Sequence, residues 1–209
     1  MRKMVVAVLA AGMLAATGGV LYSAGEAFGS TVNCVGTPGT LPGTTINSNV
    51  NVPSGSWCNI QGQTVNGNIN VAPGGGLVVG SGSTINGNIN ATNPGSFVGN
   101  PCGGGSGHFS VVIGTATVTG TTSVTGAPAD VTLGGNGCGG GVFKNNVYLN
   151  SNHGPVSLQG ENITGNAQVQ NNTGPTPIVA NNTVSNILYC SPATGSGNKA
   201  KTIYGTCTF

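Results

Sequence analysis

Few side chains in this sequence could carry out acid–base chemistry. Apart from the first 27 residues, which have the pattern of an export signal, the chain keeps two acidic residues, Asp130 and Glu161. Hydrolysis of a glycosidic bond requires two carboxyl groups close together, but these two occupy different positions of different sequence repeats. We therefore predict no catalytic function, and a polysaccharide-degrading enzyme is the alternative that the residues support least.

The histidines and cysteines also lack the sequence context of a catalytic or metal site. His108 lies in a glycine-rich loop and His153 in a Gly-Pro turn, each without an acidic neighbour in the sequence. No two cysteines have the Cys-x-x-Cys spacing that is typical of a zinc site. We therefore predict no catalytic residue, no metal and no cofactor.

The six cysteines instead indicate a disulfide framework formed in an oxidising compartment. Sequential pairing would fasten both ends of the fold and join two glycine-rich loops, although six cysteines allow many other connectivities. The expected pairs are Cys34 with Cys58, Cys102 with Cys138, and Cys190 with Cys207.

The N-terminus has the organisation of a secretory signal. A basic start, Met1-Arg2-Lys3, precedes an apolar run, and Gly25-Glu26-Ala27 supplies small residues for cleavage after Ala27. An uncleaved membrane anchor is the alternative, because the apolar run is about long enough to span a bilayer. We predict that the protein is secreted by a bacterium and that it has no contact with a membrane once residues 1–27 are removed.

The chain that remains is almost uncharged. It keeps Lys144, Lys199 and Lys201 against the two acids, and it has no arginine. Such a surface has no basic patch for phosphate groups and no acidic patch for cations. Nucleic acid is therefore not an expected partner.

A short unit recurs along the chain and is its strongest signal. Thr64-Val65-Asn66-Gly67-Asn68-Ile69-Asn70 returns as Thr84-Ile85-Asn86-Gly87-Asn88-Ile89-Asn90. The first apolar residue of each copy, called position zero, recurs about every 20 residues, apart from two longer intervals. These residues are Ile46, Val65, Ile85, Val118, Phe143, Ile163 and Val184.

The repeat predicts an all-β fold, a single-stranded parallel β-helix (β-solenoid) of about seven turns. Residues 28–192 would form the solenoid with an N-terminal cap, and residues 193–209 a C-terminal capping tail. An antiparallel sandwich is the alternative, but it does not explain the near-constant period.

Each position of the repeat has an expected direction. Positions zero, four and six are mostly apolar and should point into one core, and a second apolar cluster follows each copy. In the third copy we assign that cluster to Phe97-Val98. Position three forms an asparagine column at a corner, in which each side-chain amide is expected to bond to the next amide. Its members are Asn49, Asn68, Asn88, Asn146 and Asn166.

The two long intervals contain glycine-rich insertions, residues 100–108 and 134–141. They occupy similar stages of adjacent copies and should lie side by side on one face. Inserted loops on one face of a solenoid are often binding elements, and the alternative is a pair of flexible loops tied by a disulfide.

The unit Val-x-Gly-Asn-Ile-x-Val, the turn at Cys190 and the tail from Gly195 to Cys207 resemble a family of small secreted actinobacterial proteins. The resemblance covers most of the chain after the signal and implies a β-helix without an assigned activity. The Gly-Asn-Ile turn is also similar, more weakly, to that of bactofilins, which are cytoplasmic and polymerise end to end.

Three functions outside catalysis are open. The first is a structural or surface-associated protein of unknown molecular role, with self-association through the unpaired strand edges at the ends of the stack. The second is a module for cell-wall or extracellular polysaccharide, since Tyr148 and Tyr189 should face outward at position five, near amides. The third is ice binding, because outward threonines beside position zero resemble the Thr-x-Thr face of ice-binding β-helices. These threonines are Thr45, Thr64, Thr84, Thr117 and Thr183.

Overall fold

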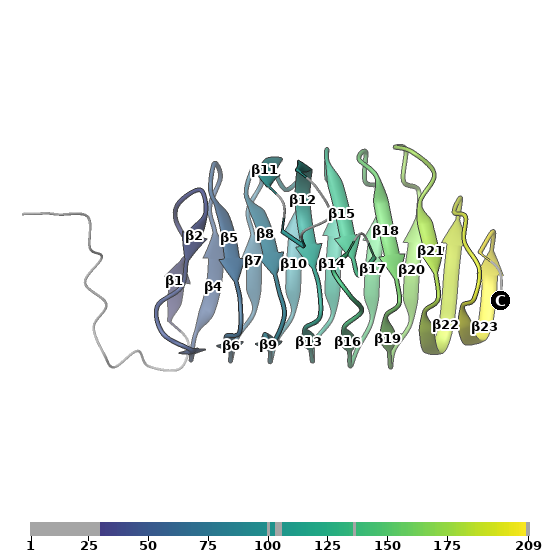
Figure 1. Cartoon of the computed structure of the whole chain (residues 1–209), viewed down its shortest axis with the longest axis horizontal. Coiled ribbons are helices and arrows are strands. Elements are labelled where there is room, and N and C mark those ends of the chain that lie inside the picture. Colours follow the sequence, from purple (N-terminus) through teal and green to yellow (C-terminus); the bar gives the residue numbers. More distant parts are fainter. Residues whose placement is uncertain (1–29, 100, 103–105, 136, 208–209) are drawn as a thin grey trace, which may run out of the picture.

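The computed structural model describes residues 30–99, 101–102, 106–135 and 137–207, so the expected signal at residues 1–27 lies outside the described residues. The described part is all-β and contains no helix. Nearly all of its strands pair in parallel with strands from the neighbouring copies of the repeat. The result is a stack of coils that is compatible with a β-helix or β-solenoid (Figure 1).

The longer sheet is 15-stranded and bends into two faces, which meet in the long strand β22 (Thr183–Ser191). The first face contains β1 (Thr31–Asn33), β4 (Asn49–Val52), β7 (Ile69–Val71), β10 (Ile89–Thr92), β14 (Thr122–Thr125), β17 (Val147–Asn150) and β20 (Ala167–Gln170). The second face contains β3 (Thr45–Ile46), β6 (Thr64–Val65), β9 (Thr84–Ile85), β13 (Thr117–Val118), β16 (Val142–Phe143) and β19 (Asn162–Ile163). Strand β23 (Lys199–Gly205) pairs with β22 at the C-terminal end.

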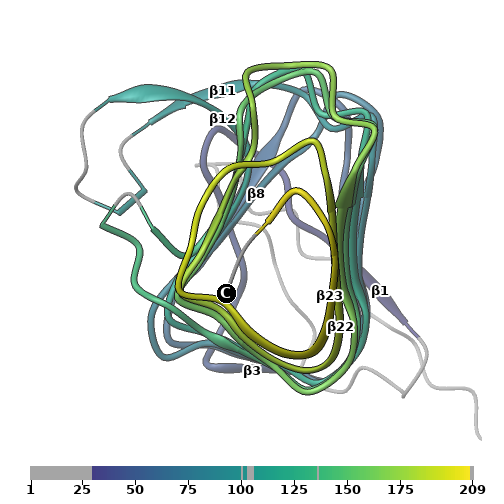
Figure 2. The same cartoon turned by 90° about the vertical axis from the view of Figure 1, so that its right-hand side faces the viewer.

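The third face is an 8-stranded sheet. It contains β2 (Gly39–Thr40), β5 (Trp57–Ile60), β8 (Gly76–Val79), β12 (Gly107–Ile113), β15 (Asp130–Leu133), β18 (Val156–Gln159) and β21 (Ile178–Ala180). Its remaining strand, β11 (Phe97–Gly99), pairs antiparallel with the start of β12. Seen along the stack, the three faces enclose one outline, and the β11–β12 hairpin projects from it (Figure 2).

The core fills the space between the three faces. Position four stacks in register from Val50 to Ile69 to Ile89, so equivalent side chains of successive coils lie one above another. The residues at positions zero, four and six are buried in every copy, which confirms the direction predicted for them. Full burial of an aliphatic or aromatic side chain stabilises a fold by roughly 1.5–3 kcal/mol, so the columns account for much of the stability.

The second apolar cluster differs from the prediction in one copy. Val111 and Ile113, and not Phe97-Val98, stack between the neighbouring coils, pairing with Leu77 and Val79. The assignment to Phe97-Val98 was wrong because the chain first leaves the stack to form β11 and returns only in β12. Val98 is 65% exposed as a result.

The asparagine column is present, but its hydrogen bonds differ from those expected. The side-chain oxygen of Asn49 accepts the backbone N–H of Asn68 at 2.8 Å, and Asn68 does the same for Asn88. A corner N–H group has no strand partner, so an unpaired one would cost free energy, and the side chain satisfies it. Only Asn166 and Asn146 also bond amide to amide within this column, at 3.2 Å.

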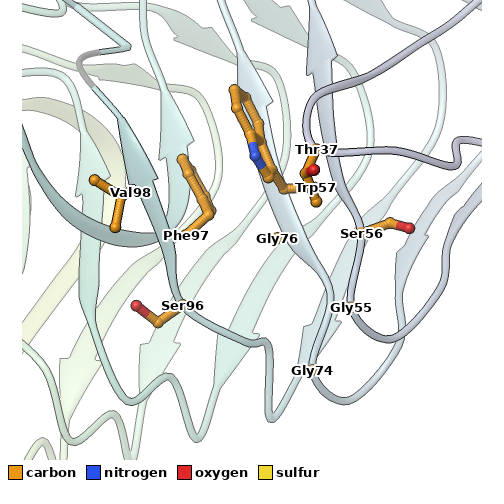
Figure 3. A pocket seen from close by; sticks show the side chains of 9 residues that line it. All are labelled: Thr37, Gly55, Ser56, Trp57, Gly74, Gly76, Ser96, Phe97 and Val98. Atoms are coloured by element: carbon orange, nitrogen blue, oxygen red, sulfur yellow. The ribbon is translucent and has the colours of Figure 1, made fainter.

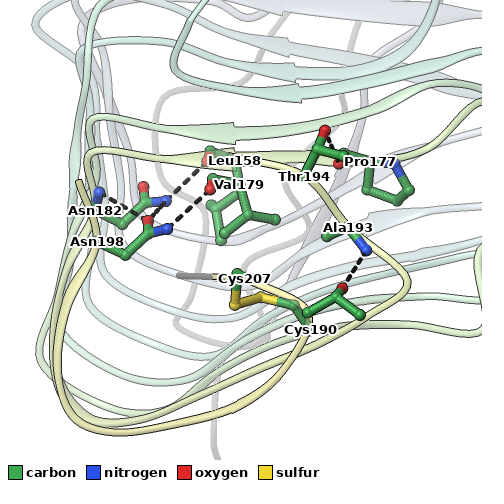
Figure 4. The surroundings of a disulfide bond; sticks show 10 residues. Leu158, Pro177, Val179, Asn182, Cys190, Ala193, Thr194, Asn198 and Cys207 are labelled. Carbon is green, nitrogen blue, oxygen red and sulfur yellow. Dashed lines mark hydrogen bonds between the residues drawn. A yellow bond between two sulfur atoms is a disulfide. The ribbon is translucent and has the colours of Figure 1, made fainter. Parts of the chain in front are cut away.

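Amide-to-amide ladders lie mainly in other columns. On the outside of the second face, Asn66 donates to Asn47 at 2.7 Å and Asn86 donates to Asn66 at 2.8 Å. A buried amide pair near the C-terminal end was not foreseen: Asn182 donates to Asn198 at 3.0 Å (Figure 4). The sequence signal that could have predicted this pair is the place of Asn182, two residues before position zero of its copy.

Three disulfides staple the stack, joining Cys34 to Cys58, Cys102 to Cys138 and Cys190 to Cys207, in the sequential order expected. The first lies near the N-terminal end. The last ties the tail to β22 beside the buried amide pair (Figure 4). Disulfides are consistent with a secreted protein.

Candidate binding surfaces

The two carboxyl groups lie in different surroundings. Glu161, at the corner before β19, is only 1% exposed, and its Oε2 accepts the backbone N–H of Gly141 at 2.5 Å. Burial raises the pKa of Glu161 to about 8, against the opposing effect of that hydrogen bond. Burial also raises the pKa of Asp130, which opens β15 on the third face, and the nearby charge of His108 partly offsets this. No described contact joins the two acids.

His108 corrects one expectation. It lies in strand β12, not in a glycine loop, and it has the acidic neighbour Asp130 because the hairpin folds back onto β15. Its Nδ1 is 3.4 Å from the Ser96 Oγ. This separation is longer than the roughly 2.6–3.2 Å that is typical of an activated serine and its base.

His153 is also engaged locally, since its Nδ1 lies 2.8 Å from the Thr173 Oγ1. Within the described residues, no three His, Cys, Asp or Glu side chains gather closely enough to hold a metal ion.

The outward tyrosines form a column on the first face. Tyr148 pairs in register with Gln168, Gln168 with Tyr189, and Tyr189 with Tyr204 of β23. Tyr189 and Tyr204 are 37% and 53% exposed. Tyr148 and Tyr189 thus occupy the outward position five expected from the sequence, and Tyr204 extends the column. The sequence does not predict Tyr204 as a member of the column, because it lies outside the repeat, in the tail expected to form a cap.

These side chains line an open hollow of about 510 Å³, which we call the tyrosine hollow. Its lining residues are Tyr148, Asn166, Ala167, Gln168, Ile187, Tyr189 and Tyr204. Aromatic faces offer broad apolar contact while their hydroxyl groups, like the amides beside them, form hydrogen bonds. None of the lining side chains carries a charge, so the hollow suits an uncharged, ring-containing ligand.

A second depression lies on the third face, beside Trp57 (Figure 3). We call it the Trp57 groove. It has a volume of about 290 Å³ and is lined by Thr37, Gly55, Ser56, Trp57, Gly74, Gly76, Ser96, Phe97 and Val98. The rings of Trp57 and Phe97 stack at 4.6 Å with an angle of 10° between their planes.

Gly76 makes that stacking possible. A Cβ atom at Gly76 would lie 2.5 Å from Cδ1 of Phe97 and 3.0 Å from Cβ of Trp57. Only glycine leaves room for the Phe97 ring to lie on the outside of β8 next to the indole.

The two insertions lie together on the third face, joined by the Cys102–Cys138 disulfide. Gly107 and His108 of the first insertion belong to β12, and the β11–β12 hairpin covers a small second core. The buried members of that core are Val78, Phe97 and Val112, with Trp57, Cys102, Phe109 and Cys138 packed against them. Phe97 at the start of this hairpin, and Ser96 just before it, line the Trp57 groove.

The threonines of the second face align as expected. Thr45 pairs with Thr64, Thr64 with Thr84, and Thr84 with Thr117. Val142 and Asn162 then interrupt the column before Thr183. The regular array therefore extends over only the N-terminal part of the face.

No protein-family model matches the chain, and neither the curated proteins nor the solved structures include a match to it. The described residues include no helix that is both long and apolar enough to cross a membrane.

Proposed function

We propose that the protein is a secreted, non-enzymatic, surface-associated β-solenoid of about seven turns, capped by disulfides, that binds a neutral polysaccharide in the tyrosine hollow. The observation that carries the proposal is the register that places Tyr148, Tyr189 and Tyr204 in one outward column.

The spacing of this column suits a polymer made of rings. Neighbouring strands lie about 4.8 Å apart, so Tyr189 and Tyr204 are one strand spacing apart, and Tyr148 lies two spacings from Tyr189. Gln168 occupies the strand between them and offers both a donor and an acceptor to sugar hydroxyl groups. A glycan lying along the stack would therefore meet rings and amides in turn.

The uncharged lining supports a neutral glycan over an acidic one. The lysines of β23, Lys199 and Lys201, are not among the residues that line the hollow. Binding should accordingly change little with salt, because screening weakens contacts between charges and leaves apolar stacking intact.

The test is retention of the purified, oxidised protein on insoluble cellulose, chitin and bacterial peptidoglycan. We expect retention on at least one of them in both low and high salt. Tyr189→Ala and Tyr204→Ala should each weaken it about tenfold, the equivalent of 1.4 kcal/mol for a lost ring. Val142→Ala is the matched control, since Val142 has the same 37% exposure as Tyr189 but lies on the second face. Failure of all three polysaccharides to retain the protein would refute the proposal.

End-to-end assembly is the structural alternative. The terminal strand β23 carries two of the chain's lysines, Lys199 and Lys201, both exposed. Lysines on an edge strand oppose pairing with another chain, so this end favours a monomer. Sedimentation of the purified protein distinguishes the binding proposal from end-to-end assembly. A single monomeric species supports the binding proposal, and filaments support assembly.

A further inference from the structure

We infer that the Trp57 groove is a second, separate site for a neutral glycan, so that one molecule can hold two polysaccharide chains. The second site stands on its own residues. Only the cross-linking of two chains rests on the proposed function of the tyrosine hollow.

The groove combines an aromatic wall with hydroxyl groups. Trp57 is half-buried, with one face of its indole against Phe97 and the remainder toward the groove. Ser56 and Ser96 lie on either side of Gly76, which also lines the groove (Figure 3). Thr37 adds a third hydroxyl group beside the indole.

The groove continues past the aromatic pair. A smaller hollow of about 180 Å³ shares Trp57 and Phe97 with it and adds the amides of Asn59 and Gln61. These amides are bonded to each other at 3.1 Å, which sets their orientation. A glycan crossing the edge of the rings would thus meet hydroxyl groups on one side and amides on the other, which are two adjoining subsites.

The lining chemistry selects the ligand class. Neither hollow is lined by a charged side chain, and a phosphate or carboxylate ligand would normally be met by arginine or lysine. Uncharged donors and acceptors around an indole edge suit sugar rings, which have hydroxyl groups at their rims and apolar faces.

The two sites cannot be served by one short oligosaccharide. The Trp57 groove lies on the third face, on β5, β8 and the β11 hairpin, in the N-terminal half of the stack. The tyrosine hollow lies on the first face, on β17, β20, β22 and β23, toward the other end (Figure 1). A stack of hydrogen-bonded coils separates them, so two occupied sites bring two chains, or two distant parts of one chain, onto one scaffold.

Tryptophan fluorescence tests the second site alone, because the chain contains a single tryptophan. The probes are soluble hexamers of β-linked glucose and of β-linked N-acetylglucosamine. We expect a saturable change in emission, unaltered in the Tyr189→Ala/Tyr204→Ala variant and weakened about tenfold in Ser56→Ala/Ser96→Ala. These serine substitutions lie outside the stacked rings, so a near-ultraviolet circular dichroism spectrum like that of the wild type establishes that the groove still folds.

Retention of Trp57→Phe and Trp57→Ala on the insoluble polysaccharides gives an independent measurement. Phenylalanine keeps a ring against Phe97, so it should bind better than alanine. Light scattering with soluble hydroxyethyl cellulose and glycol chitin then tests cross-linking, which should disappear when either site is removed.

The outcomes separate the two proposals. Retention that depends on Tyr189 and Tyr204 without any change in Trp57 emission overturns the second site and leaves the tyrosine hollow standing. A change in Trp57 emission with retention indifferent to Tyr189 and Tyr204 overturns the tyrosine hollow and leaves the second site. Binding at both sites without scattering overturns the cross-linking.

Discussion

The Oε2 atom of Glu161 lies 2.5 Å from the backbone nitrogen of Gly141 in the preceding coil, and its other carboxyl oxygen is buried without a partner among the described residues. Burial raises the pKa of Glu161 from 4.5 to about 8. The carboxyl group is therefore protonated in the folded protein at neutral pH, where it is ionised in the unfolded chain.

This relationship makes stability depend on pH. Between about pH 4.5 and pH 8 the folded state holds a proton that the unfolded state has lost, so stability falls as the pH rises through that window. Glu161→Gln removes the titration and keeps an acceptor for Gly141. We expect the variant to be more stable than the wild type at pH 9, by on the order of a few kcal/mol, and similar to it at pH 4.

Thermal unfolding of both proteins at pH 4, 6.5 and 9 measures the effect. Asp130→Asn is the control: the pKa of Asp130 is also raised, but this side chain is partly exposed, so its effect should be smaller. If the stability of Glu161→Gln and that of the wild type change in the same way from pH 4 to pH 9, the raised pKa is wrongly assigned to Glu161.

Thr122 should be a site of gained stability. It takes position four between Ile89 and Val147, it is fully buried, and its Oγ1 has no described partner. Thr122→Val replaces that hydroxyl group with a methyl group of similar size. We expect stabilisation by about 1 kcal/mol, measured by urea unfolding.

Thr125 supplies the comparison for that substitution. It lies on the same strand but is only partly buried, so its hydroxyl group is accessible to solvent. Thr125→Val should change stability by less than about 0.5 kcal/mol. A destabilised Thr122→Val protein would mean that the Thr122 hydroxyl group has a partner after all.

The corner asparagines should matter more than the outward ones. Asn68→Ala leaves the N–H of Asn88 without its acceptor, and we expect a loss of about 1 kcal/mol. Asn70→Ala, in the same copy, removes only an exposed amide contact with Asn90 at 3.3 Å and should cost less. Hydrogen exchange at the Asn88 amide should accelerate in Asn68→Ala and stay unchanged in Asn70→Ala; equal rates in both would exclude the corner role.

Gly76 should be intolerant of any side chain. Gly76→Ala drives a methyl group into the Phe97 and Trp57 side chains, so the stacked pair must move, at about 1–3 kcal/mol. Gly99→Ala is the control: Gly99 lies in β11 with Phe97, but its Cβ would lie 3.7 Å from the nearest atom of Phe97, an ordinary contact. Emission of Trp57 should shift in the first variant alone, and an unshifted Gly76→Ala spectrum would contradict the packing.

Much of the fold could be predicted from the sequence because, in a parallel stack, equivalent residues of successive repeats lie beside one another. When Val50, Ile69 and Ile89 recur at one position, parallel pairing in register puts them in one column, and their type decides that the column points inward. The outward place of Tyr148 and Tyr189 followed from the same alternation.

Features that the repeat period does not encode were determined only by the tertiary structure. The third coil is filled by Val111 and not by Phe97 because the chain leaves the stack and returns, and a local pattern does not say where it rejoins. His108 meets Asp130 only because that hairpin folds back. Glu161 is buried by a corner of the preceding coil, so its protonation depends on contacts between residues far apart in the chain. Periodicity specifies which residues stack, whereas insertions and corners depend on the packing of one coil against the next.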